Sequence, residues 1–523
     1  MHRNPSVMKH MFSEVPKAEI PRSSFDRSHG HKTTFDAGYL IPIFVDEALP
    51  GDTFKVSMTG FARLATPIFP IMDNMYMDTQ FFAVPVRLVW DNWQKFQGEQ
   101  DNPGDSTDFL VPQMVSPPVT GYDIGSVSDY MGIPTGIPGL SHSALWHRAY
   151  NLIWNQWYRD QNMQPSIPVP KDDGPDDPGI YGLRRRGKRH DYFTSSLPWP
   201  QKGPGVQIPL GGTAPVSISG GATIGGTGVG NIYMAQASGS PAGGLNMSAP
   251  TAGSGSDQIN LTGLADLSLA TAATINSLRQ AFQIQKIFER DARGGTRYTE
   301  SIKAHFGVSS PDARMQRAEY LNGGSSPVNI SPIPQTSATG AYATSPQGNL
   351  AAMGTALLKN HGFSMSFTEH CLIIGIVSVR ADLTYQQGLN RMWSRRTRVD
   401  FYLPALSHIG EQAVLQKEIY ATGTSADDIV FGYQERFGEY RYKPSIITGL
   451  MRSSAAQSLD SWHLSQDFAT APVLDASFIE ENPPIDRVIA VPSEPHFIFD
   501  SHFSMRCSRP MPVYGVPGLI DHF

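Results

Sequence analysis

The residues best suited to chemistry form a basic run near the middle of the chain. Five cations lie within six positions, at Arg184, Arg185, Arg186, Lys188 and Arg189. Guanidinium and ammonium groups at this density bind phosphates without reading base sequence. Aromatic side chains that could stack on unpaired bases follow at His190, Tyr192, Phe193 and Trp199. Two interpretations of the run are equally favoured. In one it contacts single-stranded nucleic acid. In the other it makes no such contact and is either an ion-pair hub within the fold or a solvated face.

Further cations lie near both ends of the chain. Residues 1–32 hold six Lys or Arg, three acids and four His, and their polar, proline-punctuated sequence predicts an extended, weakly basic arm. Residues 506–523 predict a second extended segment, rich in Pro and Gly. The candidate nucleic-acid contacts outside the central run are Arg3, Lys9, Arg22, Arg27, Arg506 and Arg509.

Two groups of residues resemble metal ligands only in part. His29 and His31 have no third ligand nearby, and zinc requires more, so a solvated arm is the better interpretation. Four acids gather in a Gly/Pro loop, at Asp172, Asp173, Asp176 and Asp177. They lack the ligand order of a calcium loop, which favours a solvated acidic loop. We expect no bound metal.

No catalytic motif stands out. The Gly226–Gly230 stretch GTGVG lacks the flanking strand, helix and later acid of a dinucleotide loop. Walker, HExxH and GxSxG motifs are absent from the sequence. A glycan-cleaving enzyme needs paired carboxylates in a cleft, and no pair can be singled out. We therefore expect neither an enzyme nor a cofactor.

Composition points to a protein whose surface is covered by partners. Of the 523 residues only 17% are charged, and the net charge is -6, so any nucleic-acid binding must be local. Two cysteines, Cys371 and Cys507, fit a reducing cytoplasm. The sequence contains no signal peptide and no apolar run long enough to span a membrane.

The expected elements are mostly short strands between long loops. Strands are predicted at 54–61, 77–89, 365–385, 483–491 and 497–505, and helices at 141–160 and 274–291. This pattern is typical of a β-sandwich or jelly roll with helices in its connections. Residues 201–270 differ in composition: they hold 16 of the 49 glycines and three charged residues. They predict a linker or a surface protrusion.

Several long stretches resemble the major capsid protein of the gokushoviruses, which are single-stranded DNA phages of the Microviridae. They include HKTTFDAGYLIPIFVDEALPGDTFKV (31–56), LRRRGKRHDYFTSSLPWPQKG (183–203) and YGVPGLIDHF (514–523). Residues 275–324 and 431–445 continue the resemblance, which covers nearly the whole chain apart from 210–270. One departure is Thr194-Ser195-Ser196-Leu197, where the family often has Ser-Cys-Leu-Pro.

The resemblance implies an eight-stranded antiparallel jelly roll and a T=1 icosahedral shell of sixty copies around a circular single-stranded DNA genome. The expected core comprises 33–200 and 271–505, between the arm (1–32) and the tail (506–523). The insertion 201–270 is expected to form a threefold protrusion that attaches to a host receptor. Its candidate residues are Gly225, Asn231, Tyr233, Gly244 and Asn246.

Further partners implied by the resemblance are internal scaffolding proteins and small basic DNA-binding phage proteins. Assembly is expected in the cytoplasm of the host bacterium, and the mature protein in the virion. The rival hypothesis is a non-viral β-sandwich that binds glycans. That protein would be a monomer or small oligomer with a signal peptide.

Overall fold

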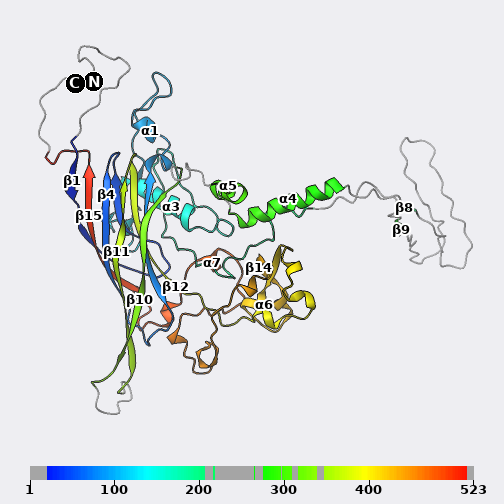
Figure 1. Ribbon diagram of the computed structural model, residues 1–523. Coiled ribbons are helices and arrows are strands. Elements are labelled where there is room, and N and C mark those ends of the chain that lie inside the picture. Colours follow the sequence, from blue (N-terminus) through cyan, green and yellow to red (C-terminus); the bar gives the residue numbers. More distant parts are fainter. Residues whose placement is uncertain are drawn as a thin grey trace, which may run out of the picture. The chain divides into compact units, whose positions relative to one another are not determined.

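The computed structural model describes residues 21–206, 216–217, 264–265, 275–295, 297–308, 316–337 and 347–514 (Figure 1). The chain divides into two compact units, one formed by residues 1–202 and 290–523 and the other by residues 203–289. The large unit contains the main sheet. In the described part of the small unit, Val216–Ser217 (β8) pairs antiparallel with Leu264–Ala265 (β9), and most of helix α4 (Ile275–Arg293) follows.

A mainly antiparallel sheet of nine strands dominates the large unit. The strand order is β1-β15-β4-β11-β10-β5-β12-β3, and β2 also pairs with β15. The bounds are Ser23–Asp26 (β1), His29–Phe35 (β2), Ile41–Ala48 (β3), Thr53–Leu64 (β4), Met75–Pro85 (β5), Glu319–Pro334 (β10), Leu350–Ser366 (β11), Cys371–Ala381 (β12) and Phe497–Arg509 (β15).

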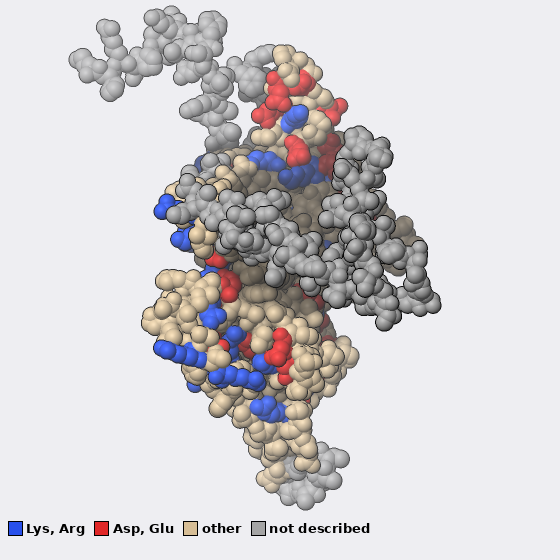
Figure 2. All heavy atoms as spheres, turned by 90° about the vertical axis from the view of Figure 1, so that its right-hand side faces the viewer, with Lys and Arg blue, Asp and Glu red and all other residues tan. Residues whose placement is uncertain are grey.

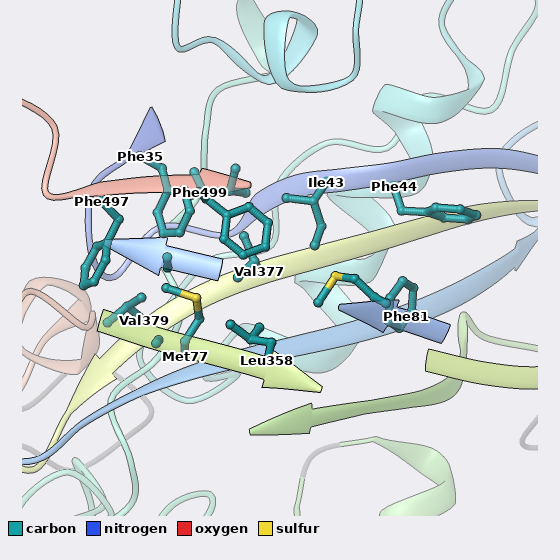
Figure 3. Close-up of a cluster of buried hydrophobic side chains, with 14 of the residues drawn as sticks. Phe35, Ile43, Phe44, Met77, Phe81, Leu358, Val377, Val379, Phe497 and Phe499 are labelled. Atoms are coloured by element: carbon teal, nitrogen blue, oxygen red, sulfur yellow. The ribbon is translucent and has the colours of Figure 1, made fainter. Parts of the chain in front are cut away.

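The sheet curls so that its two halves face one another across an aromatic core. Alternate residues of β4 and β15 are buried, which is the pattern of strands with one face in a core and one in solvent. Figure 3 shows Phe497 and Phe499 of β15 in the same cluster as Met77, Phe81 and Val377 from the opposite half. The edges meet where His29 stacks on Phe44, with ring centroids 5.8 Å apart. This curled sheet is a jelly-roll type fold, as predicted.

One half of the sheet is covered by helices. Strand β12 is buried on both faces: Ile373 and Val377 face the aromatic core, whereas Leu372 and Ile374 pack with helix α3 (Leu145–Ile153) in a second core. Gly375 is required between these layers, because a Cβ there would lie 2.7 Å from the Phe81 ring and 2.8 Å from Cβ of Phe44. In Figure 1 helices α1 (Trp93–Phe96), α3 and α5 (Tyr298–Phe306) lie on the same side of the sheet.

Smaller elements build the rest of the large unit. A hairpin of Glu411–Leu415 (β13) and Val430–Glu435 (β14) forms a third core, with Tyr192 and Phe193 packed into it. A separate two-stranded ladder joins Gln113–Val115 (β6) to Ser141–Ser143 (β7). The other α-helices of the described residues are Val127–Tyr130 (α2), Gln416–Ile419 (α6) and Ala476–Ile479 (α7), and a π-helical turn, Trp154–Tyr158, extends α3. Short 3-10 helices occur in the connections.

Some predicted elements were wrong. The strand expected at 483–491 is a 3-10 turn, Ile485–Arg487, followed by a single bridge at Ile489. The strand expected at 365–385 is interrupted between β11 and β12. The long β10–β11 pairing was not predicted, because Gly323, Gly324, Pro327, Pro332 and Pro334 lower the local preference of β10 for strand. Pairing with β5 and β11 overrides that preference.

Candidate nucleic-acid interface

The half of the sheet formed by β1, β2, β15, β4 and β11 has one exposed face. Helices α2 and α3 pack on the main sheet chiefly at β3, β5 and β12, although Tyr130 of α2 also donates to the carbonyl of Thr34 in β2 at 3.0 Å. Every second side chain of β4 and β15 is exposed or half-buried here. In Figure 1 this face is on the left of the sheet, opposite the helices. We call it the uncovered sheet face.

Cations outnumber acids on the uncovered sheet face. Five exposed cations point outward from four strands. The same face carries two exposed carboxylates, Asp26 and Asp500. Only Lys32 is ion-paired with a described residue, to Asp500 at 3.2 Å. The positive balance suits an anionic partner, because phosphates are bound through such charges. The five cations are Lys32, Lys55, Arg63, Lys359 and Arg506.

Two of these cations are direct cross-strand neighbours. Arg506 of β15 pairs in register with Lys55 of β4, and both side chains are exposed. On its other side Arg506 is opposite Asp26 of β1, although their side chains form no ion pair. Hydrogen bonds from Ser28 and, more weakly, the charge of Arg506 lower the pKa of Asp26. Like charges opposite one another destabilise a sheet, and a bound phosphate would relieve that repulsion.

Exposed apolar and ring side chains lie among the cations. Phe61 of β4 lies between Asp500 of β15 and Leu357 of β11, and both Phe61 and Leu357 are half exposed. Exposed His502 lies one row away, opposite Thr59. An exposed aromatic ring within a cationic surface can stack on a base of any identity. This surface therefore combines phosphate contacts with a stacking platform.

The central basic run lies elsewhere and makes contacts within its own chain. Arg185 stacks on Tyr39, with 4.1 Å between Cζ and the ring centroid, and donates to the carbonyl of Glu481. Arg184 donates to the carbonyl of Ile180 at 3.2 Å. The Lys188 Nζ is buried and donates to the carbonyl of Phe478 at 2.7 Å.

Arg186 joins two layers of the large unit through Asp78. Both Arg186 and Arg380 donate to Oδ2 of Asp78, at 2.8 and 2.9 Å. Burial opposes ionisation of Asp78, but the hydrogen bond from Ser325 and the two guanidiniums hold its pKa below the usual range. Burial lowers the pKa of Lys188. Within the central run, only Arg189 has an exposed side chain.

The predicted residues near the chain ends divide into three groups. Arg27 is bound to Asp46 through two hydrogen bonds, and Arg509 to Asp52 at 3.0 Å. Arg22 is exposed and reaches the carbonyl of Gly51, whereas Arg506 lies on the uncovered sheet face. The other predicted residues lie outside the described residues: Arg3, Lys9, Gly225, Asn231, Tyr233, Gly244 and Asn246.

The acidic loop is not wholly solvated, so that prediction was wrong. Asp176 is buried and accepts from Nε of buried Arg148 at 2.8 Å, and Tyr181 also donates to it. Burial opposes ionisation, but these bonds hold the pKa of Asp176 below the usual range. Asp173 accepts from the indole of Trp90 at 2.7 Å. Among the described residues no cluster of three or more His, Cys, Asp or Glu could hold a metal ion.

A second basic surface surrounds a cavity of about 580 Å³ beside the β13–β14 hairpin. The cavity is lined in part by Tyr192 and Tyr442, whose rings stack with their centroids 5.6 Å apart. Figure 2 shows Lys and Arg side chains gathered over this lower part of the large unit. Sequence reasoning missed this surface, although Arg391, Arg395, Arg396 and Arg398 lie within eight positions around Trp393.

Comparison with known proteins agrees with the fold. An antiparallel jelly roll is a fold that viral shell proteins share with lectin domains and cupins. A family model described as "Capsid protein (F protein)" matches residues 13–519. The chain belongs to this family of phage capsid proteins, as the gokushovirus resemblance predicted.

Three relatives are each named capsid protein VP1. That of Bdellovibrio phage phiMH2K is 49% identical over 530 residues, covering 98% of both chains. That of Chlamydia phage 1 is 46% identical over 597 residues, with the same coverage. That of Spiroplasma virus 4 is 38% identical over 548 residues, covering 98% of this chain and 97% of the relative. The protein is therefore a structural component of a virion and not an enzyme, and the glycan-binding alternative is wrong.

None of the helices in the described ranges is long and apolar enough to cross a membrane.

Proposed function

We propose that sixty copies of this chain form a T=1 icosahedral shell around a circular single-stranded DNA genome, with the uncovered sheet face toward the DNA. The observation that carries the proposal is the excess of unpaired cations on that face, with Arg506 opposite Lys55. Single-stranded DNA supplies phosphates that neutralise the cations and bases that stack on Phe61. Arg3, Lys9, Arg22 and Arg189 are further proposed contacts.

The proposal also includes three further kinds of partner for the shell. Internal scaffolding proteins assist assembly in the host cytoplasm, and small basic phage proteins share the neutralisation of the genome. Residues 201–270 form the threefold protrusion and contact a host receptor. The support for the protrusion is compositional, because a Gly-rich segment with three charges has little material for a core of its own.

Charge reversal on the uncovered sheet face tests the proposal. The double variant Lys55→Glu/Arg506→Glu should assemble into shells that contain much less DNA. We would measure the ratio of absorbance at 260 and 280 nm and the sedimentation of purified particles. The matched control is Arg290→Glu/Lys303→Glu, which changes the net charge equally at exposed positions on α4 and α5. Normal DNA content in the Lys55/Arg506 variant would remove this face as the genome contact.

A further inference from the structure

The cavity beside the β13–β14 hairpin has an aromatic interior whose own acids are already neutralised. Arg391 donates to Glu418 at 2.9 Å, and Arg395 donates to Glu439 at 3.2 Å. The side-chain amide of Gln412 also donates a hydrogen bond to Glu439, at 2.7 Å. Because Glu418 and Glu439 are already paired with Arg391 and Arg395, they do not neutralise the exposed cations outside the cavity.

The rim of this cavity is cationic and exposed. Lys443 lines the cavity and is exposed, whereas Arg396 and Arg398 are exposed residues that follow the lining residue Arg395 along the chain. None of these three cations forms an ion pair with a described residue. Inside the rim, Nε of Arg395 is buried without a hydrogen-bond partner among the described residues. The Arg395 guanidinium lies over the Tyr440 ring at 4.1 Å, so its plane is fixed. A fitting ligand would combine an apolar group for the interior with carboxylates for the rim.

The same chain carries a segment with this chemistry. Between Glu99 and Leu110 there are four acids, Glu99, Asp101, Asp105 and Asp108, and no cation. Phe109 and Val111 pack into the α3 core, whereas Leu110 between them is 81% exposed. Among the described residues, no backbone hydrogen bond ties 106–110 to the rest of the chain. Residues 106–110 therefore form an anchored, extended strip that presents Asp108 and Leu110 outward, after a turn at 101–104.

Within one copy these two surfaces lie at opposite ends of the large unit. Figure 2 shows Asp and Glu gathered at the top, near α1, and Lys and Arg over the lower part. We infer that the acidic segment 99–110 of one copy docks in the aromatic cavity of a second copy. Leu110 enters the cavity while Asp105 and Asp108 face Arg396, Arg398 and Lys443.

This contact rests on the proposed shell and specifies one of its interfaces. Two different surfaces meet, so the contact is heterologous, and under rotational symmetry such contacts close into rings. Charge complementarity favours the second copy over packaged DNA as the occupant. DNA would satisfy the cations, but it would leave exposed Asp108 and Leu110 without a partner, whereas Asp101 is already paired with Lys95.

Engineered thiols test the contact in trans. Particles would be prepared from cells that express the phage partners together with two forms of the chain, Asp108→Cys and Arg396→Cys. The native cysteines are buried and do not compete. Mild oxidation should yield a disulfide-linked dimer of the two forms on a non-reducing gel. The control pair, Asp108→Cys with Lys303→Cys, should yield none. Particles without the first dimer, or an equal dimer in the control, would overturn the contact.

A charge swap supplies an independent readout. Arg396→Glu/Arg398→Glu and Asp105→Lys/Asp108→Lys should each reduce particle yield at least tenfold, and combining them in one chain should restore it. Failure of the combined variant, with each half soluble and monomeric, would overturn the contact. If Arg396→Glu/Arg398→Glu instead assembles normally but contains less DNA, the cavity binds DNA. If the unmodified chain forms no particles, the proposed shell itself fails.

Discussion

Replacing Lys55 by Glu should change DNA binding and fold stability in opposite directions. Lys55 lies opposite Arg506, and both are exposed on the uncovered sheet face. Removing a like-charge pair and creating an opposite-charge pair on neighbouring strands should stabilise the sheet by about 0.5–1 kcal/mol. The same change removes one phosphate contact and adds a negative charge to the DNA surface.

The expected effect on binding follows from the cations available. Lys32 is ion-paired with Asp500. Four cations on this face remain available to bind phosphates: Lys55, Arg63, Lys359 and Arg506. Neutralising four phosphates predicts a slope of about -2.8 for log affinity against log salt on single strands, at roughly 0.7 per phosphate. Lys55→Glu should reduce the magnitude to about 2.1 or less.

Fluorescence anisotropy with a labelled oligothymidine between 50 and 300 mM salt would measure the slope, and urea unfolding would measure stability. Lys303→Glu is the matched control, because it makes the same charge change at an exposed position on α5. The control should leave the slope unchanged and should not raise the urea midpoint, because Lys303 lies in the last turn of α5, where a cation is favourable. An unchanged slope for Lys55→Glu, or an equal loss in the control, would refute the assignment of this face. A lower urea midpoint would refute the like-charge argument.

Two further predictions concern the polar cluster beneath α3. Asp176→Asn leaves buried Arg148 with only Asp172 as an anionic partner, and should cost about 3–5 kcal/mol in urea unfolding. Exposed Asp177→Asn should change the stability little, because Asn caps a helix about as well as Asp, and equal losses would contradict the argument. Burial lowers the pKa of His147 to about 3, so between pH 6.5 and 3 the unfolded state binds the additional proton and stability falls as pH falls. His147→Gln should therefore reduce the pH dependence of the unfolding free energy by up to about 1.4 kcal/mol per pH unit, and an unchanged dependence would contradict this.

The sequence predicted local features well and distant pairings poorly. The alternation of β15 was visible in residues 497–505, and the structure confirms the strand. The predicted helix at 141–160 has buried Leu145, Ala149 and Ile153, although its regular α-helical part is shorter. These elements depend on the spacing of apolar residues along the chain, which a sequence displays directly.

The site depends on pairings between distant segments. A basic residue in a sequence can be bound internally or exposed, and its partners decide which. Arg186 is held by Asp78, and Arg27 by Asp46, whereas Arg506 points outward opposite Lys55. These neighbours follow from the strand register and from the paths of the loops, which bring residues distant in the sequence together. The Arg391–Arg398 cluster was visible in principle, but Met392, Trp393 and Ser394 interrupt it, and its cavity forms only when the β13–β14 hairpin folds against Tyr192.

The most direct test of the shell is the mass and form of the assembled protein. Light scattering and electron microscopy of particles purified with the phage partners should give closed shells of about sixty copies. At 57.2 kDa per chain, the protein mass should be about 3.4 MDa. A chain that remains monomeric with single-stranded DNA and all co-expressed partners would contradict the account.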